Sequence, residues 1–341
     1  MSNLLNVKSL EVLKKEFEKL NTDTILLVVD ANVYNLYRKS FDFLNIKGKK
    51  VHIWKCLDGE ETKDYDELKH CLEFFLSKGV HRRSHLIAFG GGACSDFAGL
   101  VASMLLRGVH WSVVPTTLLS MIDASIGGKV AINSEYGKNL VGAFHLPDNI
   151  YIHQDFLDTL DSSNINSGRG ELLKYCFLDK EIGKMILDEH NFNEVIQSCA
   201  KYKQQIVEED FKESGKRKVL NLGHTVGHAL ERIFNLPHGV AVAWGILVIF
   251  KMYDDSKNLI MLKEFSGKLS INLEQPPWHN KSFPIDDIMN YIRKDKKAVT
   301  SEELDIIKIQ EIGSPEIERI KFSEFEKNLS EKIDELRKFI L

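Results

Sequence analysis

The chain has 341 residues and a mass of 39.0 kDa, a length that suits two compact domains better than one. Its net charge of −4 and pI near 6.3 argue against a nucleic acid or an anionic membrane as partner. Five scattered cysteines without a C-x-x-C pair, and an N-terminus without the apolar core of a signal peptide, lead us to expect a cytoplasmic protein with no membrane partner.

The first half of the chain alternates short apolar runs with segments of helical spacing. Such alternation predicts a parallel, Rossmann-like sheet covered by helices, in an α/β N-terminal domain that spans residues 1–156. The expected strands, each buried on both faces, lie at 24–30, 51–55, 84–89 and 110–115, and the expected helices lie at 62–78 and 96–106.

After Phe156 the pattern changes to long helical segments with few strand signals. We therefore expect a mainly α-helical C-terminal domain over residues 157–341. A late apolar segment, 304–312, is expected to be an extended ribbon that returns to the sheet, and the charged tail, 321–338, an amphipathic surface helix. The other expected helices lie at 171–189, 193–209, 219–234 and 240–253.

A glycine-rich turn follows the third expected strand. Residues 84–89 lead directly into Gly90-Gly91-Gly92, and a helix is expected to begin near Asp96. Such a turn exposes backbone N–H groups and a helix N-terminus to which a pyrophosphate can bind. Asp30 and Asn32 end the first strand, where an acidic group can hold a ribose hydroxyl. A tight βα turn without any ligand explains the glycines equally well, because Ser95 breaks the G-x-G-x-x-G pattern.

Three histidines follow in the second half. His224 and His228 are four residues apart, so on a helix they share one face, as in many two-histidine metal sites, and His238 comes ten residues later. Thr225 stands where H-E-x-x-H requires a glutamate, which argues against a metalloprotease. A metal site still needs a carboxylate, and spacing does not select one: Glu171 is one of many candidates.

Several basic residues lie in or beside polar, glycine-bearing segments instead of on plain helix surfaces. Each alone is more often a solvated surface charge, but several that converge would match a small phosphorylated acid. They are Arg107, Lys129, Lys138, Lys174, Lys203, Arg217 and Lys296.

Together these motifs resemble the dehydroquinate synthase family, in the family's order, over roughly residues 25–310. The segments that carry the resemblance are Gly90-Gly91-Gly92-x-x-x-Asp96-x-x-Gly99, Arg107-Gly108, Pro115-Thr116-Thr117-Leu118-Leu119, Asp123-x-Ser125-x-Gly127-Gly128-Lys129, Gly137-Lys138-Asn139, Leu220-Asn221-x-Gly223-His224-Thr225-x-Gly227-His228, His238-Gly239 and Asp295-Lys296-Lys297.

The resemblance implies a metal, zinc or cobalt, held by Glu171, His224 and His238, whereas helical spacing alone pairs His224 with His228. It implies a homodimer in which Arg107 reaches across the interface. The catalytic residues that it implies are Lys174, Asp123, His228 and Lys129, and the substrate-binding residues are Arg107, Asn139, Lys203, Arg217, Asn221 and Lys296. The NAD-binding residues that it implies are Asp30, Asn32, Glu60, Lys63, Gly91, Gly92, Asp96, Thr116, Thr117, Lys138 and Thr159.

The activity that the resemblance implies is a phosphate-eliminating cyclisation in the shikimate pathway. The substrate would be 3-deoxy-D-arabino-heptulosonate 7-phosphate, and the products 3-dehydroquinate and phosphate, through transient oxidation by NAD, elimination, reduction and aldol closure. Asn164, Arg169 and Val240 depart from the family's pattern. They leave open a related cyclase that acts on sedoheptulose 7-phosphate or glucose 6-phosphate. An NAD-dependent polyol dehydrogenase and a catalytically inactive relative are further alternatives.

Overall fold

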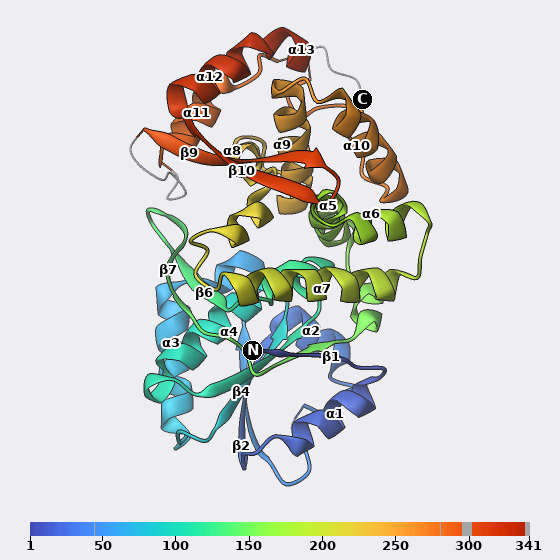
Figure 1. Cartoon of the computed structure of the whole chain (residues 1–341). Helices are drawn as coiled ribbons and strands as arrows, with labels where there is room; N and C mark the ends of the chain where they lie inside the picture. Colours follow the sequence, from blue (N-terminus) through green and yellow to red (C-terminus); the bar gives the residue numbers. More distant parts are fainter. Residues whose placement is uncertain (44, 280, 295–301, 338–341) are drawn as a thin grey trace. The chain divides into compact units, whose positions relative to one another are not determined.

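The computed structural model describes residues 1–43, 45–279, 281–294 and 302–337 (Figure 1). Its contacts divide the chain into two compact units. Unit 1 comprises Met1–Leu160 and Lys203–Glu208, and unit 2 comprises Asp161–Tyr202 and Glu209–Leu341. The sequence places the domain boundary between residues 156 and 157. The structure divides the chain slightly later and also assigns one stretch of helix α7 (Phe192–Glu209) to unit 1.

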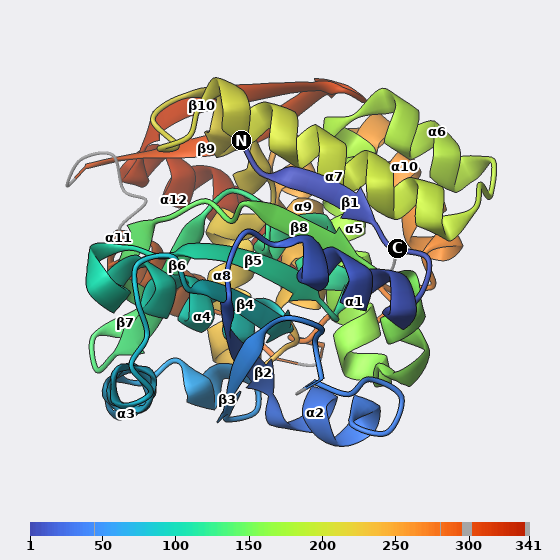
Figure 2. The same cartoon turned by 90° about the horizontal axis from the view of Figure 1, so that it is seen from below.

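A six-stranded parallel sheet forms the centre of unit 1, as predicted. Its strand order is β1-β8-β5-β4-β2-β3, and it can be followed in Figure 2. The strands are β1 (Asn3–Asn6), β2 (Thr24–Asp30), β3 (Lys50–Cys56), β4 (His85–Gly90), β5 (His110–Pro115) and β8 (Asn149–Ile152).

Helices cover both faces of this sheet because parallel neighbours can be joined only by crossover connections. Helices α1 (Leu10–Lys19) and α2 (Ala31–Tyr37) lie on one face, and α3 (Tyr65–Ser77) and α4 (Gly92–Met104) lie on the other (Figure 2). The remaining short helices of unit 1 are η1 (Gly59–Thr62), η2 (Leu105–Arg107), η3 (Ser120–Ala124) and η4 (Gln154–Thr159).

The structure corrects three expectations in unit 1. Strand β3 is only partly buried, since it forms the edge of the sheet and pairs with β2 alone. Helix α4 begins at Gly92 and not near Asp96, because the glycine turn leads directly into the helix. A separate antiparallel hairpin, β6 (Lys129–Ser134) and β7 (Gly137–Phe144), was not predicted. Strand β7 is mostly exposed and lacks an apolar alternation that would have indicated it.

Unit 2 is mainly helical, as predicted. Its charged tail forms α12 and α13, which bury Phe325, Leu329 and Leu336. In the described part of the chain, no helix has both the length and the apolar character that crossing a membrane requires. Besides α7, the helices are α5 (Ser162–Leu178), α6 (Lys180–Leu187), η5 (Lys216–Asn221), α8 (His224–Phe234), α9 (His238–Met252), α10 (Ser256–Lys268), α11 (Ile285–Lys294), α12 (Phe322–Glu331) and α13 (Ile333–Arg337).

Three expectations for unit 2 were wrong. The single helix expected at 171–189 is two helices, α5 and α6, which meet at Asp179. The segment at 304–312 is a strand, β9 (Glu303–Glu311), but it does not return to the six-stranded sheet. It pairs with β10 (Ser314–Lys321), and this ribbon contacts α5 and η5, where its apolar side chains are buried. The expected single helix around 219–234 is interrupted at Gly223, which adopts a φ of 76°. Helix α8 therefore starts at His224.

Helices α5, α8 and α9 approach one another closely because glycines lie where they cross. A Cβ atom added at Gly245 would lie 2.0 Å from the carbonyl oxygen of Gly223. A Cβ atom at Gly239 would lie 1.8 Å from the carbonyl oxygen of Ser167, and one at Gly170 would lie 2.0 Å from that of Gly239. No side chain fits at such distances, so the crossing requires glycine at these positions.

We predict that Gly245→Ala destabilises the protein by about 1–3 kcal/mol, because the added methyl group must push α9 away from α8. Urea unfolding measures this change. The control is Gly267→Ala in α10, where an added Cβ meets nothing within 4 Å. This variant should be unchanged or more stable by about 0.5–1 kcal/mol. Equal losses in both variants would contradict the proposed close crossing.

Candidate functional site

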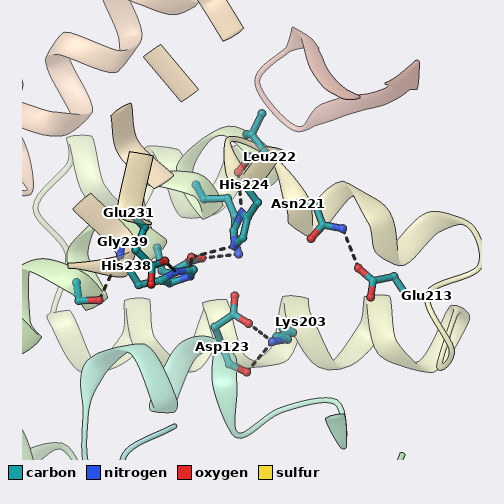
Figure 3. A network of polar contacts seen from close by, with 12 residues as sticks. Asp123, Lys203, Glu213, Asn221, Leu222, His224, Glu231, His238 and Gly239 are labelled. Atoms are coloured by element: carbon teal, nitrogen blue, oxygen red, sulfur yellow. Dashed lines mark hydrogen bonds and ion pairs between the residues drawn. The ribbon is translucent and has the colours of Figure 1, made fainter. Parts of the chain in front are cut away.

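The glycine crossing of unit 2 brings together three side chains that are distant in sequence. Glu171 follows Gly170, His224 follows Gly223, and His238 precedes Gly239. The Nε2 atoms of His224 and His238 lie 3.2 and 3.1 Å from the Oε1 atom of Glu171. Figure 3 shows the two imidazole rings turned toward each other. We call Glu171, His224 and His238 the carboxylate–histidine cluster.

The hydrogen bonds around this cluster determine which tautomer each histidine adopts when it is neutral. His224 Nδ1 lies 3.1 Å from the carbonyl oxygen of Leu222, which can only accept, so this nitrogen carries the hydrogen. His238 Nδ1 donates in the same way to the Glu231 carboxylate at 2.9 Å (Figure 3). When a ring is neutral, its Nε2 lone pair therefore points at the Oε1 atom of Glu171. Lone pairs that face an anion repel it unless a proton or a metal ion lies between them.

The carboxylate of Glu171 is almost completely buried beside the ammonium group of Lys174, at 2.5 Å. Burial acts to raise the pKa of Glu171, but Lys174 and His224 lower it more, so the pKa lies well below its usual value. Burial likewise acts to lower the pKa of His238, yet the hydrogen bonds with Glu171 and Glu231 raise it to about 9. The cluster thus holds an anionic carboxylate that attracts positive charge.

These donor groups fit a divalent metal ion. Both carboxylate oxygens of Glu171 are buried, and their polar neighbours are the Lys174 ammonium group and the two imidazole nitrogens. A carboxylate and two imidazole nitrogens with open positions are a common ligand set for a catalytic zinc ion. The ring of His228 lies close by, and the nitrogens of His224, His228 and His238 are all within 4.8 Å of one another. Geometry therefore leaves His228 as an alternative ligand, as the helical spacing suggested.

The glycine turn of unit 1 leaves little space for side chains. A Cβ atom at Gly91 would lie 3.0 Å from the Cγ2 atom of Thr117, and one at Gly92 would lie 3.1 Å from the Cβ atom of Ala124. No side chain caps the N-terminus of α4, so the backbone N–H groups of its first turn can bind an anion. Thr116 is buried beside this turn, and its N–H donates to the carbonyl oxygen of Gly90 at 3.0 Å.

Asp30 also has a structural task. Its carboxylate caps α2 by accepting hydrogen bonds from the N–H groups of Asn32 and Val33, at 2.9 and 3.2 Å. Burial raises the pKa of Asp30. The hydroxyl oxygens of Thr159 and Tyr37 lie 3.0 Å apart and connect η4 to α2. These contacts hold the carboxyl ends of the strands in place.

A second group of implied NAD residues centres on Lys63, which is buried. Its Nζ atom lies 2.7 Å from the Asp96 carboxylate and 4.0 Å from Glu60, and it donates a hydrogen bond to the side chain of Asn139. Burial raises the pKa of Asp96, although Lys63 acts to lower it. Lys138 is exposed on β7 beside Asn139. The structure thus brings Glu60, Lys63, Asp96 and Asn139 together.

The basic residues of unit 1 occupy two settings. Arg107 is exposed in a turn where Leu106, Arg107 and Gly108 all have positive φ, and Lys129 is exposed at the start of β6. Lys203, in contrast, is buried and forms an ion pair with Asp123, whose carbonyl oxygen it also contacts at 2.7 Å (Figure 3). Lys203 therefore has an acidic partner already.

Two of the predicted substrate residues of unit 2, Arg217 and Asn221, lie in η5 beside the loop that follows α7. Arg217 is buried, and its guanidinium donates to the carbonyl oxygen of Phe211 at 2.6 Å. Asp210 shapes this loop by accepting hydrogen bonds from the N–H groups of Ser214, Gly215 and Arg217 at 2.7–3.0 Å. Burial acts to raise the pKa of Asp210, but these bonds lower it to about 2. Asn221 donates to Glu213 at 2.7 Å (Figure 3), and Lys296 lies outside the described residues.

Sequence reasoning missed three polar residues that the structure places in these networks. Glu231 holds His238, and its spacing of three residues from His228 on α8 could have indicated it. Asp210 gave no periodic signal because its partners, Ser214, Gly215 and Arg217, lie in an irregular loop. Asn133 gave none because Glu60 is distant from it in sequence.

Comparison with known families decides the relationship. A model described as 3-dehydroquinate synthase N-terminal matches residues 53–167, and one described as 3-dehydroquinate synthase C-terminal matches residues 168–298. A 3-dehydroquinate synthase from Pyrococcus furiosus is 40% identical over 277 residues, which are 77% of this chain and 79% of the relative. Another from Clostridium tetani is 36% identical over 335 residues, which are 91% and 86% of the two chains.

The chain belongs to the 3-dehydroquinate synthase family. A crystal structure of 2-deoxy-scyllo-inosose synthase complexed with carbaglucose-6-phosphate, NAD+ and Co2+ has the same fold. It matches with a TM-score of 0.81 and 22% identity over 97% of this chain and 96% of that chain. The fold is therefore shared between dehydroquinate synthases and a cyclase of another name.

Proposed function

We propose that this chain converts 3-deoxy-D-arabino-heptulosonate 7-phosphate to 3-dehydroquinate and phosphate, with NAD and a divalent metal as cofactors. The observation that supports a metal-dependent step most directly is the buried carboxylate–histidine cluster, because two imidazole nitrogens converge on one carboxylate oxygen at 3.1 and 3.2 Å. Its curated relatives bear the name 3-dehydroquinate synthase at 40% and 36% identity.

Glu171, His224 and His238 would hold the metal, with Glu231 orienting His238. When bound, the metal would polarise a substrate hydroxyl, and NAD would accept a hydride and later return it. Lys174 would donate a hydrogen bond to that hydroxyl, since its ammonium group lies at the buried edge of the cluster.

NAD would bind to unit 1 around the glycine turn. Its pyrophosphate would accept hydrogen bonds from the N–H groups of Gly91, Gly92 and the following residues, where side chains are excluded. The other residues proposed for this subsite are Asp30, Asn32, Glu60, Lys63, Asp96, Thr116, Thr117, Lys138 and Thr159.

The substrate's phosphate and carboxylate would bind to different basic groups. Lys129, Asn139, His228 and Arg107 would hold the phosphate. The exposed, positive-φ turn at Arg107 suits a residue that reaches a second copy of the chain, and we propose a homodimer on this basis.

All five cysteines are buried free thiols, as suits the reducing cytoplasm.

Arg217 would bind the carboxylate of the heptulosonate, with Lys203 and Asn221 as further contacts. A guanidinium group can engage a carboxylate through two parallel hydrogen bonds. Lys203 is already paired with Asp123, so Arg217 is expected to contribute more. Glucose 6-phosphate and sedoheptulose 7-phosphate lack this carboxylate, so they would gain no such contact with Arg217.

A panel of sugar phosphates tests the proposed function. With NAD and zinc or cobalt present, the heptulosonate should release phosphate faster than sedoheptulose 7-phosphate or glucose 6-phosphate. Absorbance at the NADH band should not rise in step with phosphate, because the hydride returns within each turnover. Faster turnover of another sugar phosphate would contradict the substrate, and stoichiometric NADH would support a polyol dehydrogenase instead.

A second prediction concerns Arg217. Arg217→Ala should raise the KM for the heptulosonate by about 10-fold to 100-fold, since a charged hydrogen bond contributes roughly 1.5–3 kcal/mol. The matched control is Lys216→Ala, whose exposed side chain pairs with Glu209 at 2.6 Å. The control should leave the KM unchanged. Equal KM values in the two variants would show that Arg217 does not bind the carboxylate.

A further inference from the structure

Asn133 lies at an irregularity in the β6–β7 hairpin. The pairing register of the two strands shifts between Ile132 and Ser134, so Asn133 does not take part in the regular ladder. Its backbone N–H donates instead to the carbonyl oxygen of Lys63, at 2.8 Å. Such bulges commonly redirect a side chain. Here the bulge turns Asn133 toward η1, the short helix that precedes Lys63.

The side chain of Asn133 connects two of the proposed subsites. Its Nδ2 atom donates to the Oε2 atom of Glu60 at 2.8 Å, and its Oδ1 atom accepts from the N–H group of Asn139 at 3.0 Å. Glu60 belongs to the proposed NAD subsite and Asn139 to the proposed phosphate subsite. One amide group therefore contacts both.

Asn139 needs support of this kind. Its φ is 56°, in the left-handed region that non-glycine residues seldom occupy, although asparagine tolerates it better than most. The bond from its N–H to Asn133 and the bond from Lys63 to its side chain hold it there. Lys63 in turn binds Asp96 at 2.7 Å. The contacts at Asn139 thus lead back to two residues of the NAD subsite.

The bridge is not needed to satisfy buried groups. Glu60 and Asn139 are both exposed, so water could replace either hydrogen bond at little cost in stability. A direct amide bridge between two exposed groups fixes their relative positions. This positioning, and not the stability of the fold, explains why the bridge is present.

We propose that Asn133 is a positioning residue that couples the binding of NAD to the binding of the substrate's phosphate group. The inference rests on the proposed function. NAD that engages Glu60 fixes the Asn133 amide, and this amide fixes the N–H group of Asn139 before phosphate arrives. The free-energy cost of ordering Asn133 and Asn139 is then met by whichever ligand binds first. Each ligand therefore raises the affinity for the other by the same factor.

The test measures the affinity for NAD by calorimetry in the metal-loaded protein, with and without saturating inorganic phosphate. In the unaltered protein, phosphate should lower the Kd for NAD by about fivefold or more. In Asn133→Ala the factor should fall toward one, since only the contact of Lys63 with Asn139 still joins the two subsites. The control is Tyr136→Ala at the tip of the same hairpin, where the side chain is 91% exposed. This variant should keep the original factor.

A reciprocal exchange separates coupling from a general loss of structure. Asn133→Asp retains an acceptor for the N–H of Asn139 but places a carboxylate against Glu60, so it should abolish the coupling. Adding Glu60→Gln restores a donor and an acceptor with their positions exchanged, and the coupling factor should recover even if NAD binds more weakly overall.

The outcomes distinguish this inference from the proposed function. An unaltered protein that binds NAD and turns over the heptulosonate, yet shows a coupling factor of one, would overturn the role of Asn133 alone. A factor that persists in Asn133→Ala would overturn it as well. Failure of the unaltered protein to bind NAD at all would instead contradict the proposed function.

Discussion

The feature on which this account depends is the buried, anionic carboxylate of Glu171. An ionised group removed from water is costly unless opposite charge and directed ligands surround it. Lys174 supplies a positive charge 2.5 Å from the Oε2 atom, and His224 and His238 direct ring nitrogens at the Oε1 atom from 3.2 and 3.1 Å. Glycines make this arrangement possible, because larger residues at the helix crossing would separate the backbones that carry these side chains. In unit 2, the geometry of the candidate metal site therefore depends directly on the close packing of the helices.

Unit 1 forms its candidate subsites by a different principle. A parallel sheet brings the carboxyl ends of β2 and β4 to one edge, where Asp30 caps a helix and the glycine turn excludes side chains. The hairpin β6–β7 packs Val130, Ala131 and Ile132 of β6 against α4. Polar contacts of Asn133 and Asn139 then join it to η1 and Lys63. Such polar contacts can rearrange on ligand binding at a lower cost in free energy than the contacts of a packed core.

The sequence predicted those features that the periodicity of apolar residues indicates. Strands β2 and β5 lie where their uninterrupted apolar runs indicated, because both faces of these strands are buried. Periodicity also paired His224 with His228, but it could not relate either histidine to Glu171 or His238, which lie on other helices. The resemblance to a family supplied that relationship. Asn164, one of the departures from the family, has a local explanation: its backbone and side chain both donate to Asp161, the N-cap of α5. Nothing in the structure explains Arg169 or Val240.

The most direct test of the central claim is X-ray absorption spectroscopy of the zinc- or cobalt-loaded protein. The account predicts one metal per chain, with two imidazole ligands and one carboxylate ligand at about 2.0–2.2 Å and the remaining positions filled by water. His228→Ala should leave this spectrum unchanged. A site with three imidazole ligands that loses one in His228→Ala would contradict the assignment of Glu171, His224 and His238, and so would a protein that binds no stoichiometric metal.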